Sequence, residues 1–79
     1  MNIIYPENFD RYKMYHCQVD VMYRSGKSKR TGKFYFKWTS EFEEDRLIKK
    51  VNKFKLPSEK VVEVKISIIP DHEIIPPFF

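Results

Sequence analysis

Hydrophobic and polar residues alternate with a period of two in three stretches of the chain, residues 12–24, 33–38 and 60–69. This period is typical of a strand that buries one face and leaves the other in contact with water. The apolar rows are Tyr15, Cys17, Val19, Val21 and Tyr23 in the first stretch, Phe34, Phe36 and Trp38 in the second, and Val62, Val64, Ile66 and Ile68 in the third. We therefore predict three long strands. The third ends at Pro70, because proline cannot donate to a strand ladder.

A different period marks the segment between the second and third strands. Its apolar positions recur at helical spacing and are Leu47, Ile48, Val51 and Phe54. Ser40 precedes Glu43 by three residues, the spacing of a capping box, in which each side chain bonds the other residue's backbone N–H. Acidic residues gather early in the segment and lysines late, as the helix macrodipole favours. The pattern predicts a helix that begins at Ser40 and ends before Pro57.

The connections complete a β-β-α-β order. The polar stretch from Ser25 to Gly32 has glycine near both ends and predicts a hairpin loop. A helix between the second and third strands lets both run in one direction, so both can pair antiparallel with the first. We expect an α+β fold, with a three-stranded antiparallel sheet in the order 2-1-3 and the helix packed on one face. Ile3-Ile4-Tyr5 is ambiguous and could add a short edge strand that Pro6 ends.

Length and cysteine content limit the fold further. A chain of 79 residues predicts a single domain, residues 1–79, with a C-terminal tail at 70–79. Cys17 is the only cysteine, whereas secreted domains of this size usually need several disulfides. The N-terminus lacks the basic leader and apolar stretch of a signal peptide, and no apolar run approaches the length of a membrane span. These features predict a cytoplasmic protein with no membrane partner.

Positive charge is concentrated in one part of the chain. The formal net charge is +4, yet no acid lies between Asp20 and Glu41. The intervening twenty residues contain six basic residues, so this segment carries +6 and the remainder carries −2. A local excess of this kind attracts an anionic partner. It is equally compatible with a solvated hairpin that resists aggregation, because edge lysines commonly serve that purpose.

The basic hairpin, residues 24–37, is the main candidate binding site. Lysine and arginine side chains supply phosphate contacts, and Tyr35 lies between two lysines, where a base could stack on its ring. Proteins that bind single-stranded nucleic acid on a sheet face use this combination. Phe34 and Trp38 are expected in the core, because a thin domain needs its largest apolar side chains there. The candidate nucleic-acid-binding residues are Arg24, Lys27, Lys29, Arg30, Lys33, Tyr35 and Lys37.

The C-terminal tail is a second candidate binding site. Asp71-His72-Glu73 is followed by an apolar run that ends in Pro-Pro-Phe-Phe. Over about nine residues this segment resembles the C-terminal tip of bacterial single-stranded-DNA-binding proteins, in which acids precede Ile-Pro-Phe. The resemblance implies docking onto a partner protein, since that tip docks replication and repair proteins. The tail has fewer acids, an extra proline and an extra phenylalanine. Its candidate partner-binding residues are Ile74, Ile75, Pro76, Pro77, Phe78 and Phe79.

Catalytic motifs are sparse. His16 and Cys17 are neighbours on a strand and point to opposite faces, so they cannot form a base–nucleophile pair, and Cys17 is expected in the core. Asp71-His72-Glu73 is a compact ionisable cluster, but consecutive loop residues rarely converge on one metal ion. Asp20 and Glu63 beside the basic loop leave a hydrolytic nuclease as a minor alternative. We therefore expect a non-catalytic protein without a metal or another cofactor.

Two functions of different classes are compatible with these observations. The first is a nucleic-acid-binding module that uses the basic hairpin, and the charge asymmetry favours it. The second is a protein-interaction module, such as a small inhibitor or adaptor, that docks a partner through its tail or an exposed strand edge. A homodimer could use the same surfaces. The bias toward Lys, Ile, Tyr and Phe is compatible with a phage-encoded or low-GC bacterial gene.

Overall fold

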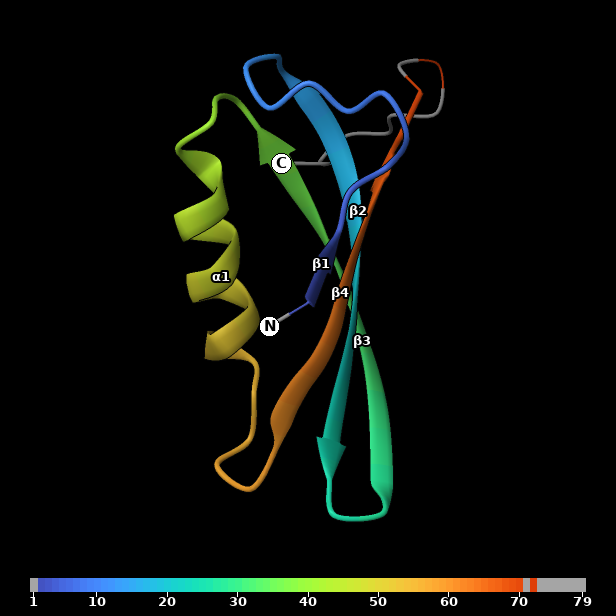
Figure 1. Ribbon diagram of the computed structural model, residues 1–79, viewed down its shortest axis with the longest axis vertical. Helices are drawn as coiled ribbons and strands as arrows, with labels where there is room; N and C mark the ends of the chain where they lie inside the picture. Colours follow the sequence, from blue (N-terminus) through green and yellow to red (C-terminus); the bar gives the residue numbers. More distant parts are fainter. Residues whose placement is uncertain (1, 71, 73–79) are drawn as a thin grey trace.

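One helix covers one face of a four-stranded sheet in the computed structural model, which describes residues 2–70 and 72 (Figure 1). The elements in chain order are β1 (Asn2–Ile4), β2 (Tyr15–Ser25), β3 (Ser28–Trp38), α1 (Glu43–Lys53) and β4 (Lys60–Ile68). The strand order in the sheet is β1-β4-β2-β3. β2 is antiparallel to both β3 and β4, whereas β1 is parallel to β4. The fold is therefore α+β with a mixed sheet.

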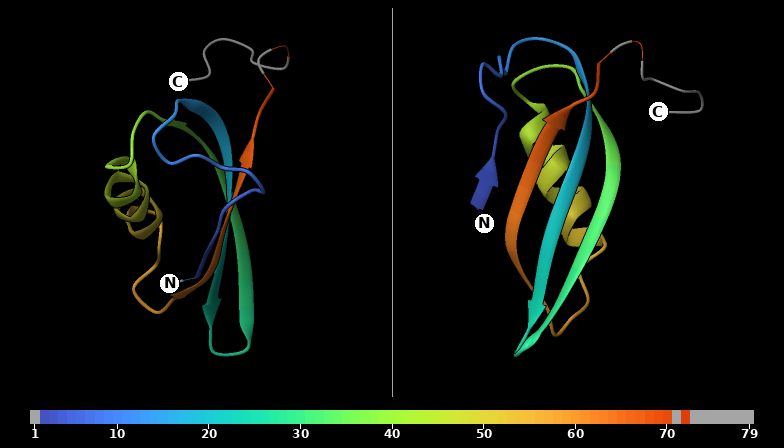
Figure 2. Two further views of the ribbon diagram at one scale, coloured as in Figure 1. Left: turned by 45° about the horizontal axis from the view of Figure 1, so that its top comes forward. Right: turned by 90° about the vertical axis from the view of Figure 1, so that its right-hand side faces the viewer.

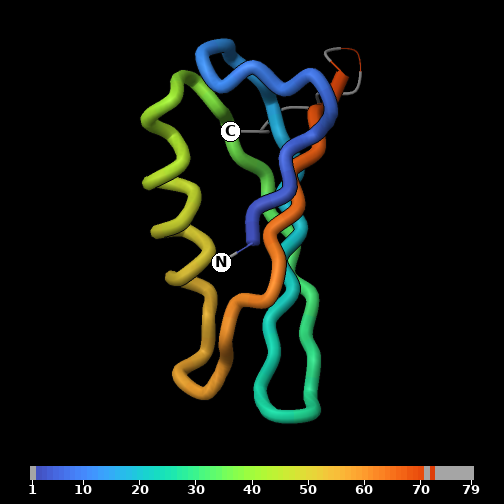
Figure 3. Tube along the Cα trace, in the orientation of Figure 1, coloured from blue at the N-terminus to red at the C-terminus, as the bar shows by residue number. Residues whose placement is uncertain are grey.

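The prediction of a three-stranded, purely antiparallel sheet is wrong because the N-terminal residues add a fourth strand. Ile3 of β1 pairs with Val64 of β4, and Pro6 follows two residues after the strand ends. The chain between β1 and β2 then crosses one end of the sheet (Figure 3). This crossing allows β1 to run in the same direction as β4. A three-residue apolar run has too short a pattern to show by itself whether it pairs.

The predicted hairpin loop at residues 25–32 is also wrong. β2 and β3 stay paired from Tyr15 opposite Trp38 to Ser25 opposite Ser28, so only Gly26 and Lys27 form the turn. Gly26 has a φ of +58°, which suits glycine at the first position of a tight hairpin turn. Because residues 28–32 belong to a strand, their side chains alternate between the two faces of the sheet.

The helix begins later than the capping-box spacing predicts. Its first residue is Glu43, and the preceding Phe42 makes no side-chain cap. Ser40 instead accepts a turn bond at its carbonyl from the Glu43 N–H, at 3.0 Å. The Glu43 carboxylate bonds to the Thr39 hydroxyl at 2.8 Å and to Arg46 at 2.6 Å, and not to the Ser40 backbone. Phe42 is 76% exposed.

The core lies between α1 and the sheet. The rows that alternate in the sequence meet here, except that Val62 and Ile68 of the third row are 42% and 38% exposed. The buried apolar residues are Cys17, Val19, Val21, Tyr23, Phe36, Trp38, Leu47, Val51, Val64 and Ile66. The predicted core positions of Phe36, Trp38 and Cys17 are confirmed, while Phe34 is half-buried against the same cluster. Burial raises the pKa of the Cys17 thiol to about 11, so this thiol is protonated at neutral pH.

Aromatic side chains close the end of the core that the N-terminal segment crosses. The Trp38 ring lies edge-on to Phe9 and Tyr5, with ring centres 5.1 and 5.9 Å away, and the Trp38 Nε1–H donates to the Arg11 carbonyl at 2.9 Å. The Tyr5 hydroxyl donates to Glu44 of α1. Burial, with Glu44 adding to it, raises the pKa of Tyr5 to about 12. These contacts hold the helix start against the sheet.

No helix within residues 2–70 and 72 has both the length and the apolar character needed to cross a bilayer.

Candidate nucleic-acid interface

The sheet has one face covered by α1 and one face that no helix of the described residues covers (Figure 2). We call the second the open face. The register of β2 with its two neighbours places residues of β3, β2 and β4 side by side across it. Basic residues come from all three strands and are Lys29, Lys33 and Lys37 of β3, Arg24 of β2, and Lys60 and Lys65 of β4. Their acidic neighbours on the face are Asp20 and Glu63.

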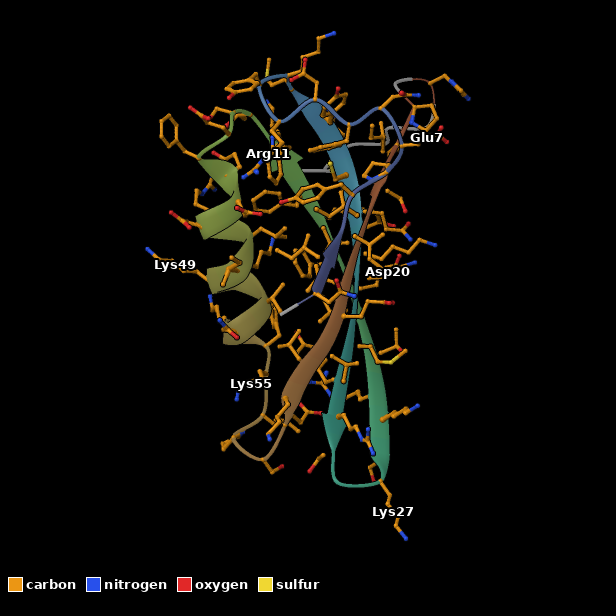
Figure 4. All side chains as sticks on the ribbon, viewed as in Figure 1. Glu7, Arg11, Asp20, Lys27, Lys49 and Lys55 are labelled. Atoms are coloured by element: carbon orange, nitrogen blue, oxygen red, sulfur yellow. The ribbon has the colours of Figure 1, made fainter. Side chains whose placement is uncertain are left out.

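Two transverse rows carry most of this charge. At the hairpin end, Arg24 of β2 pairs with Lys29 on one side and Lys60 on the other, so three positive charges lie abreast. Nearer the middle of the sheet, Asp20 pairs with Lys33 and Lys65. Figure 4 shows Asp20 on the side of the sheet away from the helix and Lys27 at the hairpin tip. The single carboxylate of the second row leaves that row positive.

Tyr35 lies between Lys33 and Lys37 along the same side of β3 and is 45% exposed. Opposite it on β2 is Gln18, whose amide donates to Asp20 at 3.2 Å. The Tyr35 ring thus belongs to the open face together with the lysines, while Phe34 and Phe36 face the helix. An exposed ring flanked by ammonium groups is a surface on which a base can stack while its phosphates contact lysine.

Arg30 faces the helix side and not the open face. Its register partner is Tyr23, which is buried, and the Arg30 guanidinium lies 4.4 Å from the centre of the Tyr23 ring. The guanidinium donates to both carboxylate oxygens of Glu59, at 3.0 and 2.7 Å, and to the Phe54 carbonyl at 3.0 Å. Glu59 comes from the connection before β4 and neutralises this charge. We therefore leave Arg30 out of the interface.

The Arg30–Glu59 pair is a structural clamp. Hydrogen bonds from Arg30, and then from the Leu56 N–H, hold the pKa of Glu59 down at about 2, and the same pair raises the pKa of Arg30. Gly32 is next to this cluster, where an added Cβ would lie 3.3 Å from Cε2 of Tyr23. The positive charge of residue 30 therefore ties β3 to the segment that follows α1.

The other predicted residues divide as follows. Lys29, Lys33, Tyr35 and Lys37 lie on the open face, together with Arg24, whose guanidinium also donates to the Gly26 carbonyl at 2.8 Å. Lys27 is in the turn. The predicted tail residues Ile74, Ile75, Pro76, Pro77, Phe78 and Phe79 lie outside the described residues, as do Asp71 and Glu73 of the acidic cluster.

Lys60 and Lys65 belong to the open face but were not among the predicted residues. Lys65 lies opposite the apolar row of the alternating stretch 60–69, so its side of the strand was predictable. Lys60 is in step with that row, and strict alternation would place it on the helix side. The register between β2 and β4, however, shifts at Met22 and Tyr23. This irregularity aligns Lys60 with Arg24.

Asp20 and Glu63 share the open face but are offset by one row, since Glu63 pairs with Met22. Within residues 2–70 and 72, no three His, Cys, Asp or Glu side chains are grouped as ligands of a metal ion would be. The described side chains therefore give the nuclease alternative no further support.

No protein-family model, curated protein or solved structure matches this chain.

Proposed function

We propose that this protein binds single-stranded nucleic acid across the open face of its sheet, without catalysis. The observation that carries the proposal is the convergence of basic residues from three adjacent strands around an exposed tyrosine. Six basic residues share the face with two acidic ones. Such a surface favours the binding of a polyanion, because each phosphate contact releases counterions.

The arrangement suits a single strand better than a duplex. The basic residues are spread over a sheet face, and the described helix lies on the opposite face of that sheet. Bases of a single strand are accessible for stacking, and Tyr35 offers a ring between two lysines. Lysine contacts to phosphate carry no sequence information, so we expect weak sequence preference.

Fluorescence anisotropy with a labelled oligothymidine tests the proposal. The triple change Lys29→Ala, Lys33→Ala and Lys65→Ala removes charge from both transverse rows, on the outer strands β3 and β4, and leaves the core intact. Binding should weaken, and the slope of log K against log salt should become less steep by about 2, because each single-strand phosphate contact contributes about 0.7.

A second triple variant controls for net charge. Lys13, Lys49 and Lys53 are exposed and lie outside the open face, and Figure 4 shows Lys49 pointing away from the sheet. Changing these three to Ala removes the same charge but should leave the salt slope unchanged. Equal weakening by both triple variants would mean that net charge, and not the open face, attracts the oligonucleotide. The proposal would then be abandoned.

A further inference from the structure

A groove runs between the edge of β3 and the helix, on the side of β3 that faces away from β2. Within the described residues β3 pairs only with β2, so β3 is an edge of the sheet. In the right-hand view of Figure 2, α1 lies behind the sheet and its C-terminal end approaches this edge. Two hollows of about 360 and 190 Å³ follow the groove. Between them, α1 and β3 supply most of the walls.

The floor and the helical wall of the groove are built from regular rows. Arg46, Lys50 and Phe54 are spaced four residues apart and lie on one side of the helix. The Lys50 ammonium is 4.9 Å from the centre of the Phe34 ring, and the Phe54 ring centre is 6.1 Å from the same ring. The Arg46 guanidinium lies 5.8 Å from the centre of the Phe36 ring. The groove is thus basic above an aromatic floor.

The edge of β3 directs backbone groups into this groove. Lys50 Nζ donates to the Tyr35 carbonyl at 3.3 Å, so that carbonyl points away from β2. In an antiparallel pair, every second residue shares this orientation. Lys33, Thr31 and Lys29 therefore present their N–H and C=O groups to the same edge as Tyr35. An added strand could hydrogen-bond to this row of backbone groups. The Lys50 ammonium takes the place that one backbone N–H of such a strand would occupy.

Charge selects the occupant. Lys37, Arg46 and Lys50 line the larger hollow, and Arg30 and Lys33 line the smaller one, with no Asp or Glu among the described lining residues of either. Arg46 and Arg30 are already paired with Glu43 and Glu59, whereas Lys50 and Lys33 make no ion pair with another described residue. An extended segment with carboxylates would complement this lining.

A second copy of the chain is a poor occupant. If two β3 strands paired antiparallel, the residues Lys29, Lys33 and Lys37 of one copy would oppose members of the same row in the other. Like charges directly opposite each other on adjacent strands are destabilising. Edge lysines generally prevent such self-pairing.

We propose that the groove between β3 and α1 binds an extended, acidic segment of a partner protein, which adds as a fifth strand to the β3 edge. A backbone N–H of the segment replaces Lys50 at the Tyr35 carbonyl, and the released ammonium pairs with a carboxylate of the segment. Apolar side chains of the segment enter the smaller hollow, against Phe34 and Phe54. This site borders the open face and shares Lys33, Tyr35 and Lys37 with it, but the proposal does not depend on nucleic-acid binding.

Anisotropy with a labelled decapeptide in which threonine alternates with glutamate or valine, so that glutamate and valine share one side of the strand, tests the proposal. It should bind the full chain, and the same peptide with lysine in place of glutamate should not. Lys50→Glu should weaken binding roughly tenfold, because it reverses the charge in the groove. Lys49→Glu, a matched change on the exposed side of the helix, should have no effect. Circular dichroism checks that both variants are folded.

Two N-methylated peptides separate strand addition from simple charge attraction and need no protein variant. One carries N-methyl groups on its threonines and the other on its glutamates and valines. Only one set of N–H groups faces β3, so one methylated peptide should lose binding and the other should retain it. Equal binding of the two methylated peptides, or no binding of the unmethylated glutamate peptide, would overturn the proposal. A dimer of the free protein with protected β3 amides would also overturn it, because a second copy would occupy the edge.

Discussion

The two faces of the sheet use positive charge in different ways. On the helix-covered side, Arg30 and Arg46 are bonded to glutamates and lie over aromatic rings. The open face carries five lysines and one arginine, in strands that place acids only at Asp20 and Glu63. All three ion pairs within the described residues use an arginine, the third being Arg11 with Glu44.

The number of basic residues in a segment therefore overstates the positive charge that the segment presents to a partner. The planar guanidinium presents a rigid fork that matches a carboxylate, so arginine is readily held in structural pairs. Lysine is a point charge on a flexible stem and suits phosphate contacts that need little geometry. We therefore expect the covered face to serve stability and the open face to serve binding.

The largest expected effect is on the covered face. Trp38 is fully buried, and Trp38→Ala should lower the free energy of unfolding by about 3–5 kcal/mol, since it leaves a cavity beneath Phe9 and Tyr5 and removes the bond to the Arg11 carbonyl. Urea denaturation measures the loss. Tyr35→Ala on the open face is the comparison and should stay within about 0.5 kcal/mol. Similar losses at both positions would contradict the division between the faces.

A smaller effect on stability should appear at acid pH. The pKa of Glu59 is lowered from 4.5 to about 2 by its bonds to Arg30 and the Leu56 N–H. The stabilisation is therefore complete above pH 4.5 and is lost as the pH falls toward about 2. Across this window, the midpoint temperature of thermal unfolding should fall more steeply with decreasing pH for the natural chain than for Glu59→Gln. Glu59→Gln should also be less stable at neutral pH. Glu41→Gln, an exposed control, should show the same decrease in midpoint temperature at acid pH as the natural chain. If the midpoint temperatures of all three proteins decrease in parallel at acid pH, the Arg30–Glu59 clamp contributes nothing to stability.

On the open face, the Tyr35 ring should contribute to nucleic-acid binding. Removal of its ring by Tyr35→Ala should weaken oligothymidine binding by about 1 kcal/mol, because one base loses its stacking surface. Tyr35→Phe keeps the ring and should bind like the natural chain in the same anisotropy assay. If the phenylalanine variant is as weak as the alanine variant, stacking is not the contribution of this residue.

The smallest expected effect is that of one open-face charge. Lys65→Ala should make the slope of log K against log salt less steep by about 0.7, with unchanged thermal stability. Lys49→Ala on the helix should leave the slope as it was. A null result for Lys65 would restrict the interface to β2 and β3.

Much of the fold was predictable because alternation and helical spacing are local signals. The apolar rows identified the long strands, the helix and the core positions of Trp38 and Cys17. Errors arose where the signal was short or shared. The three residues of β1 were too few to show a period. The polar residues 28–32 have the composition of a loop, although they form part of a strand. Ser40 had the right spacing for a cap, but Glu43 found stronger partners in Thr39 and Arg46.

The candidate site was predictable in outline only. Lys29, Lys33, Tyr35 and Lys37 alternate with apolar residues, so their common face follows from local geometry. The fate of Arg30 does not, because Glu59 is twenty-nine positions away in the chain. The alignment of Lys60 with Arg24 depends on the register shift between β2 and β4.

The amino-acid sequence by itself determined which residues alternate, which segment is helical and where basic residues are dense. The tertiary structure alone decided which of those charges are neutralised, which strands bring distant lysines together and which strand is left as an edge. The physical reason is range. Side-chain periodicity acts over a few residues, whereas ion pairing and strand register join segments that meet only after the chain has folded.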